Sequence, residues 1–288
     1  MVAVPNGSNS RTVGAPVWFR SVREAVRGRG REAVGQLSLT TVLYLVYRYG
    51  RVLVLHHEAR AFANARSVWD LERAAHLPSE TSLNAFFANS ELLAIPANVY
   101  YATVHFPFAI ATLVWLWVFR APLYRWTRNV MVGLTGTALL VHIFFPLAPP
   151  RMMHDLGFVD LAAVYGESVY GSPETDTLSN QFAAMPSLHI GWALLLALAL
   201  CFAFRSRWRW LFLAHPLITT VVVVATANHY WLDGIVAVAL MVVVIALVRA
   251  VSAWQARRRV ANGEPASEGL SPGEPVEEPG RQLVTAQR

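Results

Sequence analysis

Residues 185–233 read MPSLHIGWALLLALALCFAFRSRWRWLFLAHPLITTVVVVATANHYWLD. The stretch holds two apolar runs, residues 187–204 and 210–226, which are joined by a short arginine-rich turn. Each run is close to the length of a helix that crosses a hydrocarbon core of about 30 Å. Because the second helix returns to the side where the first began, we expect Met185–His189 and His229–Asp233 to meet at one face of a membrane.

The composition is that of a membrane protein. Hydrophobic residues make up 55% of the 288 residues and charged residues only 15%, with a mean hydropathy of +0.39; a soluble domain carries about a quarter charged residues. Every basic residue is an arginine, and the net charge of +6 is spread over short segments between apolar runs. Nucleic-acid binders instead cluster basic residues on a folded domain, so we expect no nucleic-acid partner. The lone Cys201 excludes an intramolecular disulfide.

Four further apolar runs predict an all-α fold, a polytopic membrane protein with a six-transmembrane-helix bundle. The six predicted spans cover residues 36–54, 97–119, 129–147, 187–204, 210–226 and 231–251. The first span is the weakest, because it contains Arg48 and Arg51 and an arginine at mid-bilayer costs roughly 2.5–3.5 kcal/mol. The chain therefore divides into a flexible head at 1–34, a membrane domain at 35–252 and a disordered tail at 253–288, which is rich in Glu, Pro and Gly.

The placement of arginines predicts the orientation of the bundle. Cytoplasmic segments are enriched in Lys and Arg, and the arginines gather in the head, in the tail and in the turns at 120–128 and 205–209. The loop at 149–186 carries five acids against Arg151 alone. We therefore expect this loop on the extracytoplasmic side of the plasma membrane and both termini in the cytoplasm. Helical spacing at 63–77 and 81–89 predicts interfacial helices on the same outer side.

His229 and Asp233 are four residues apart, which places both on one face of a helix. A carboxylate in that position can hold the tautomer of an imidazole and stabilise its positive charge, which leaves the other ring nitrogen free to attack. The alternative is a purely structural role as a polar cap at a helix end, because a single H-x-x-x-D pattern often arises by chance. The neighbouring motifs favour catalysis.

The Met185–His189 motif opens the fourth predicted span, with Pro186 in its first turn. A helix start offers unpaired N–H groups, here including that of Leu188, and a positive dipole end that binds phosphate. Ser187 adds a hydroxyl donor, and His189 is placed to protonate an oxygen that leaves phosphorus. Taken alone, the motif could be an ordinary Pro/Ser helix cap.

Arg151 follows two prolines that end the third span. Its guanidinium can donate a bidentate fork to phosphate oxygens and stabilise the charge of a pentacoordinate transition state. An isolated arginine at a span end more often snorkels to the interface, but the rigid Pro149-Pro150 pair and the acidic loop favour a functional residue.

Other polar residues of the predicted outer end are candidates for a substrate pocket. These are Tyr101, His105, Asn180 and Gln181. We expect His142 to buttress the bundle, and His215 to lie near the inner face, roughly 20 Å from His229 at 1.5 Å per helical residue. No cluster has the spacing of metal ligands, so we expect no metal and no cofactor.

Taken together, the motifs resemble those of the type 2 phosphatidic acid phosphatase superfamily, over roughly residues 60–250. Pro186-Ser187-x-His189 resembles its second signature motif, and His229-x-x-x-Asp233 resembles its third. The sequences APPR at 148–151 and AMPSLH at 184–189 resemble the motifs of the branch that contains inositol phosphorylceramide synthase.

The chain departs from the family pattern at three places. Leu188 stands where the second motif has glycine, Val222 and Val223 stand where the third motif has Ser-Arg, and the lysine of the first motif is absent because the chain has none. The resemblance therefore leaves Arg151 as the main candidate to clamp a phosphate.

The resemblance implies a six-helix bundle, a phosphohistidine on His229, His189 as the acid and Asp233 as the partner of the nucleophile. It implies a lipid phosphatase or phosphotransferase that meets a lipid phosphate and membrane lipids, with water or a polyol such as inositol as the acceptor. The rival interpretation is a non-enzymatic carrier or binding protein for a lipid or polyprenyl phosphate. Asp233 argues against this rival, because phosphate binding alone needs no oriented nucleophile.

Overall fold

The computed structural model describes residues 58–166 and 181–262, together with residues 30, 34, 35, 38, 41 and 45. Its α-helices are α3 (Glu58–Ala74), α4 (Glu80–Ala88), α5 (Glu91–Thr103), α6 (His105–Phe119), α7 (Ala121–Phe144), α8 (Leu161–Tyr165), α9 (Leu188–Ala203), α10 (Ala214–Ala225) and α11 (Trp231–Ala261). Three 3-10 helices, η1 (Pro150–Met152), η2 (His154–Leu156) and η3 (Arg207–Leu213), complete the described elements. The described part of the chain thus confirms the all-α prediction.

Several helices have the character of membrane spans. The continuous helical segment Arg207–Ala225 and helix α11 are long and apolar enough to cross a bilayer, and α5 with α6 counts as a third span if the bent pair is taken together. Helix α9 is apolar but shorter. The protein is therefore a helical membrane protein, whereas the count of six spans stays a prediction. The first predicted span, 36–54, falls almost entirely outside the described residues.

The second predicted span, 97–119, is not one straight helix. It begins earlier, at Glu91, and α5 and α6 meet at a bend of 41° next to Val104. Pro107 in the first turn of α6 explains the break, because its ring cannot donate a backbone hydrogen bond and clashes with the carbonyl four residues before it.

The last helix is longer than predicted. The sequence predicts a span that ends at residue 251 and a disordered tail from 253, but α11 continues to Ala261. Residues 255–261 contain alanine and arginine, which favour helix, and the first glycine comes only at Gly263. The start of the tail at 253 was therefore wrong, and the remainder of the tail lies outside the described residues.

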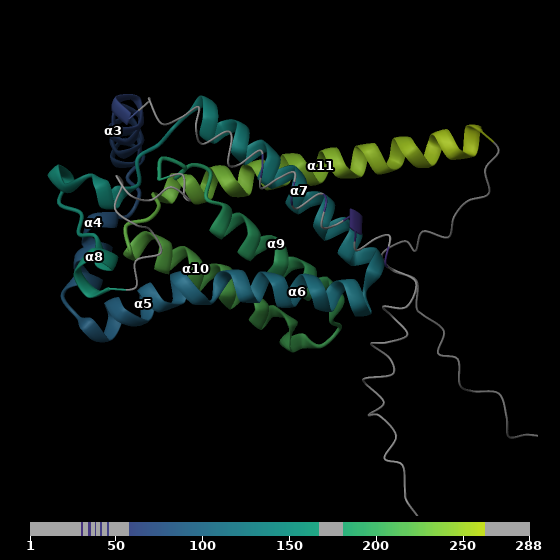
Figure 1. Ribbon diagram of the computed structural model, residues 1–288, viewed down its shortest axis with the longest axis horizontal. Coiled ribbons are helices and arrows are strands. Elements are labelled where there is room, and N and C mark those ends of the chain that lie inside the picture. The colour runs from purple at the N-terminus through teal and green to yellow at the C-terminus, as the bar shows by residue number, and fades with distance from the viewer. Residues whose placement is uncertain are drawn as a thin grey trace, which may run out of the picture.

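Helices α6, α7, α9, α10 and α11 run side by side as a bundle, while α3, α4 and α8 gather at one end of it (Figure 1). Close approaches hold α9 to its neighbours. A Cβ on Gly234 of α11 would lie 2.7 Å from Ile190 Cδ1 of α9, and one on Gly191 would lie 3.0 Å from Leu134 Cδ2 of α7. The first turns of α9 and α11 therefore stay in direct contact.

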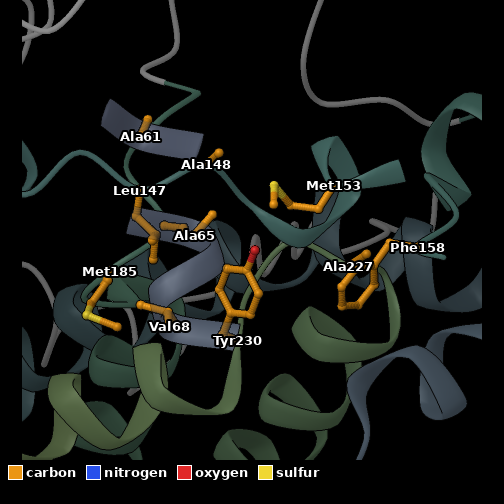
Figure 2. Packing of buried hydrophobic residues seen from close by; sticks show 11 residues of the cluster. Ala61, Ala65, Val68, Leu147, Ala148, Met153, Phe158, Met185, Ala227 and Tyr230 are labelled. Atoms are coloured by element: carbon orange, nitrogen blue, oxygen red, sulfur yellow. The ribbon is translucent and has the colours of Figure 1, made fainter. Parts of the chain in front are cut away.

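The end that carries α3 has a hydrophobic core of its own (Figure 2). Tyr230, Leu147 and Met153 are almost fully buried there, and they pack with Ala61 and Ala65 of α3. The core joins the surface helix α3 to the segment that follows α7 and to the α10–α11 connection. It thereby fixes the loops that carry the predicted motifs. The expected interfacial helices, 63–77 and 81–89, correspond to α3 and α4.

Candidate active site

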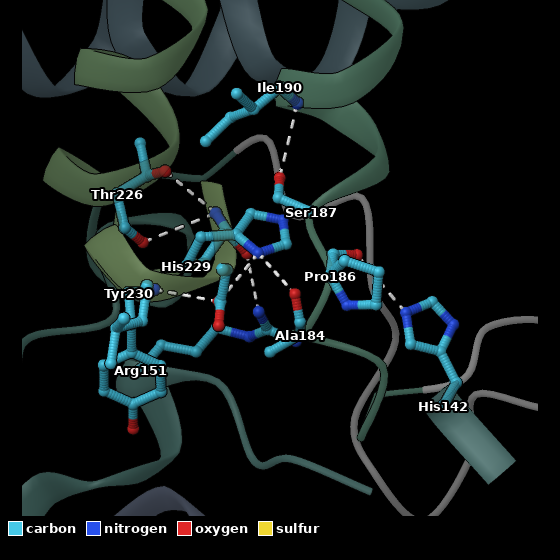
Figure 3. Close-up of polar contacts among 12 residues, drawn as sticks. His142, Arg151, Ala184, Pro186, Ser187, Ile190, Thr226, His229 and Tyr230 are labelled. Carbon is cyan, nitrogen blue, oxygen red and sulfur yellow. Dashed lines mark hydrogen bonds and ion pairs between the residues drawn. The ribbon is translucent and has the colours of Figure 1, made fainter. Parts of the chain in front are cut away.

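The three sequence motifs meet at this end of the bundle (Figure 3). The amide of Arg151 donates to the carbonyl of Ala227 at 2.7 Å, and the amide of Ser187 donates to the carbonyl of Asp233 at 3.1 Å. His229 Nδ1 lies 2.9 Å from the carbonyl oxygen of Ala184. Backbone hydrogen bonds therefore join segments that are far apart in the sequence and gather their polar side chains.

His229 is held from one side of its ring. Nδ1 lies 2.9 Å from Ala184 O and 3.1 Å from Asp233 Oδ2, and His229 and Asp233 are 6% and 0% exposed. A carbonyl oxygen can only accept, so Nδ1 must carry the proton and donate. The neutral ring then has its free lone pair on Nε2. Asp233 Oδ2 also accepts the amide of Tyr230 at 2.9 Å, which fixes the carboxylate.

Ser187 and Leu188 form the start of α9. Ser187 is the N-cap residue, and its Oγ accepts the amide of Ile190 at 3.3 Å. Pro186 lies just before the cap rather than in the first turn, so that part of the prediction was wrong. The amides of Leu188 and His189 are at the first two helical positions, which have no acceptor inside the helix. They are suited to bind an anion.

The ring of His189 lies between His229 and the α5–α6 bend. Its centroid is 5.8 Å from that of His229, 4.8 Å from that of Tyr101 and 4.7 Å from that of His105. Two of the four predicted pocket residues, Tyr101 and His105, thus pack on His189 and are 7% and 2% exposed. The bend at Val104 brings them there.

His215 is closer to the site than predicted. Its ring centroid is 6.2 Å from that of His105, so it belongs to the same aromatic cluster, and its Nδ1 lies 2.8 Å from the hydroxyl of Tyr100. The predicted distance between His215 and His229 assumed one continuous helix as far as His229. The helix α10 instead ends at Ala225, and the chain turns back toward α11.

Arg151 is buried, with 7% exposure, and its side chain is oriented by a residue that the sequence reasoning missed. Arg151 Nη1 donates to Asn228 Oδ1 at 2.6 Å, and Asn228 Nδ2 donates to Thr226 Oγ1 at 2.9 Å. The Thr226 hydroxyl in turn donates to the carbonyl of Val222 at 2.8 Å. The signal for Asn228 was its place directly before His229, between two motifs.

The remaining predicted residues differ in what the structure says of them. His142 is buried, and its Nε2 lies 3.4 Å from the carbonyl oxygen of Pro186, in the role of a buttress. Gln181 lies in a turn before the motif, whereas Asn180 is outside the described residues. Within 58–166 and 181–262, no three His, Cys, Asp or Glu side chains are arranged to hold a metal ion.

With this geometry in view, comparisons with known proteins identify the family. A family model described as the PAP2 superfamily matches residues 66–247, which contain all three motifs. The chain belongs to the PAP2 superfamily. This finding confirms the resemblance that the motifs predicted.

A curated relative from the same branch of the PAP2 superfamily is also similar. The inositol phosphorylceramide synthase catalytic subunit aur1 of Schizosaccharomyces pombe is 32% identical over 126 residues, which is 37% of this chain and 28% of the relative. The similar segment thus spans little more than a quarter of that protein's length. No solved structure shows a significant match. The PAP2 superfamily and this relative support the class of lipid phosphatases and phosphotransferases.

Proposed function

We propose that the protein is an integral membrane enzyme that cleaves a lipid phosphoester through a phosphohistidine on His229. The observation that carries the proposal is the pair of acceptors around His229 Nδ1, Ala184 O and Asp233 Oδ2. They hold the proton on Nδ1 and leave Nε2 as a nucleophile. The ring centroid of His189 lies 5.8 Å from that of His229, so His189 is placed to protonate an oxygen that leaves the same phosphorus.

The reaction has two steps. In the first step His229 Nε2 forms a bond to phosphorus, the bond from phosphorus to the leaving oxygen breaks, and His189 gives that oxygen its proton. In the second step the hydroxyl of an acceptor gives its proton to His189 and attacks phosphorus, and the nitrogen–phosphorus bond breaks. Asp233 stabilises the imidazolium form of His229 in both steps. Each step balances without a metal or other cofactor.

Three groups are suited to bind the phosphoryl oxygens. The guanidinium of Arg151 is oriented by Asn228, which is the residue next to the nucleophile. The amide of Leu188 and the hydroxyl proton of Ser187 lie at the start of α9, whose dipole favours an anion. These donors would stabilise the charge that grows on the equatorial oxygens in the transition state.

The substrate class follows from where the site lies. Helices α6, α10 and α11 expose large apolar side chains along their outer faces, which suits contact with lipid. The motifs lie at one end of these helices, and with the helices across a bilayer we expect this end to lie at the level of the lipid headgroups. From the arginine distribution we assign this end to the extracytoplasmic face of the plasma membrane, with both termini in the cytoplasm.

The acceptor of the second step is either water or an alcohol. The relative's name, inositol phosphorylceramide synthase, favours a polyol such as inositol as one of the participating alcohols. The matched segment covers only 28% of that relative. We therefore propose phosphoryl transfer as the common chemistry and make the acceptor a result of the assay.

The test is turnover of a panel of lipid phosphates by purified protein, with and without inositol and other polyols. We expect consumption of at least one lipid phosphate in buffer that contains EDTA. Release of inorganic phosphate would identify water as the acceptor, and a phosphorylated polyol would identify transfer. A soluble short-chain substrate should be consumed by intact cells without permeabilisation, because the site faces outward. Consumption only after permeabilisation would place the site on the cytoplasmic side.

The rival is a carrier that binds a lipid or polyprenyl phosphate without breaking a bond. It predicts saturable binding of the labelled lipid together with complete recovery of the intact lipid. Binding without turnover across the whole panel would replace the enzymatic proposal by this one.

A further inference from the structure

Two carboxyl groups from the surface helices lie buried against the catalytic end of the bundle. Glu72 of α3 and Glu80 of α4 are both 0% exposed. Each has one buried oxygen, Glu72 Oε2 and Glu80 Oε1, for which the described residues offer no hydrogen-bond partner. Two ionised carboxylates have only acceptors, so these two oxygens can satisfy each other only if the pair holds one proton. An acid on an amphipathic surface helix is expected in water, and both acids instead face inward.

The other partners show which of the two carboxyl groups holds the proton. Glu80 Oε2 lies 2.6 Å from Arg73 Nη2, so Glu80 keeps its negative charge beside a cation. Glu72 Oε1 accepts the amide of Leu232 at 2.7 Å. The remaining oxygens, Glu72 Oε2 and Glu80 Oε1, are buried and have no hydrogen-bond partner among the described residues. A single proton on Glu72 Oε2, directed at Glu80 Oε1, would satisfy both oxygens.

This pair supports the first turn of α11. The amides at a helix N-terminus have no acceptor inside the helix. Asp233 accepts the amide of Tyr230, and Glu72 accepts that of Leu232. A third hydrogen bond runs from Trp231 Nε1 to the carbonyl of Pro78, at 2.9 Å, in the connection between α3 and α4. Leu232 is bonded directly to Asp233, so a displacement of this turn displaces the carboxylate that orients His229.

We propose that Glu72 is a positioning residue of the reaction, which shares one proton with Glu80 and in that state holds the first turn of α11 so that Asp233 and His229 keep their reactive arrangement. The inference rests on the proposed function for its effect on turnover. Its effect on the first turn of α11 stands independently of any substrate.

Loss of the shared proton would place a second negative charge in this buried region. The charged groups around Glu72 are Glu80 of α4, Asp233 of α11 and Arg73, which already pairs with Glu80. Burial, followed by the hydrogen bond and the charge of Glu80, raises the pKa of Glu72 from its ordinary 4.5 to about 9, while the amide of Leu232 acts in the opposite direction.

Because folding raises the pKa of Glu72, the stability of the folded protein decreases as the pH rises. The folded protein keeps the proton on Glu72 at neutral pH, and the unfolded chain does not. The stabilisation from the protonated pair is therefore complete below about pH 4.5, declines as the pH rises, and is lost above about pH 9. A variant with an amide in place of Glu72 has no such loss.

The first experiment compares Glu72→Gln and Glu72→Ala with Asp70→Asn, which changes an exposed acid on the same helix. Glutamine keeps an acceptor for Leu232 and a donor for Glu80, so we expect near-normal kcat at pH 7 and a smaller loss of kcat between pH 8 and 10 than in the wild type. Alanine loses both contacts, and kcat should fall roughly tenfold to hundredfold with KM little changed. Asp70→Asn should match the wild type throughout.

The second experiment needs no turnover, so it tests the positioning role of Glu72 even if the proposed function fails. Hydrogen exchange at the amides of residues 230–234 should be faster by about tenfold or more in Glu72→Ala and unchanged in Glu72→Gln. The melting temperature of the wild type in detergent should fall from pH 7 to 10 by more than that of Glu72→Gln. Unchanged exchange in Glu72→Ala would overturn the positioning role, and identical pH profiles for wild type and Glu72→Gln would overturn the shared proton. Should Glu72→Ala not fold, the Glu72→Gln comparison alone decides.

Discussion

We expect His229→Asn to abolish phosphoryl transfer, with a loss in kcat of at least about 10⁴-fold, because it removes the atom that we propose attacks phosphorus. Asparagine is the sharper test than alanine. His229 is only 6% exposed, and its Nδ1 contacts Ala184 O and Asp233. The asparagine amide keeps an N–H donor close to Nδ1, whereas alanine would leave Asp233 buried without this partner.

The measurement is rapid alkaline quenching of the enzyme with a lipid labelled in its phosphate, because a phosphohistidine is stable in alkali. The wild type should accumulate an acid-labile phosphoenzyme that His229→Asn lacks. His154→Ala serves as the control, because His154 is an exposed histidine at the same end of the molecule. A folded His229→Asn protein with substantial turnover would remove His229 as the nucleophile.

We expect Arg151→Lys to lower kcat by about 10²-fold or more, because an ammonium group cannot reproduce the planar fork that we propose binds two phosphoryl oxygens. The substitution also changes the hydrogen bond to Asn228, which orients the guanidinium. Vanadate forms trigonal-bipyramidal adducts that resemble the transition state. We therefore expect its inhibition constant to rise in parallel with the loss of kcat.

Two further variants separate the phosphate clamp from a general effect of charge. Arg66→Lys is the matched control, since Arg66 is an exposed arginine of α3 that pairs with Asp155; its activity and vanadate inhibition should stay normal. Asn228→Ala keeps the guanidinium but removes its orienting partner, so its loss should be smaller than that of Arg151→Lys. Normal vanadate inhibition in Arg151→Lys would mean that the clamp lies elsewhere.

The sequence predicts the convergence of the motifs because their spacing follows from membrane thickness. Forty positions separate His189 from His229, enough for one helix in, a turn and one helix back. The structure places the two rings 5.8 Å apart. The i, i+4 spacing of His229 and Asp233 likewise predicts a contact that the structure contains.

Other features depend on contacts that no local pattern encodes. The carbonyl of Ala184 is a backbone group 45 positions from His229, and Asn228 acquires its role only from the arrival of Arg151. The burial of Glu72 and Glu80 is a further case, because helical spacing in an amphipathic segment places acids on the solvent face. The bend at Val104 had a local signal in Pro107, but the packing of His105 on His189 did not.

The two acceptors around Nδ1 of His229 have a stereochemical consequence for the proposed reaction. Ala184 O and Asp233 contact the ring at Nδ1, so in the proposed mechanism only Nε2 meets phosphorus and the ring need not turn between the two steps. Each in-line displacement inverts the configuration at phosphorus, so two displacements on one fixed nitrogen restore it. A chiral, isotopically labelled phosphoryl group passed to an alcohol would therefore emerge with retained configuration, whereas direct transfer between substrate and acceptor would emerge inverted.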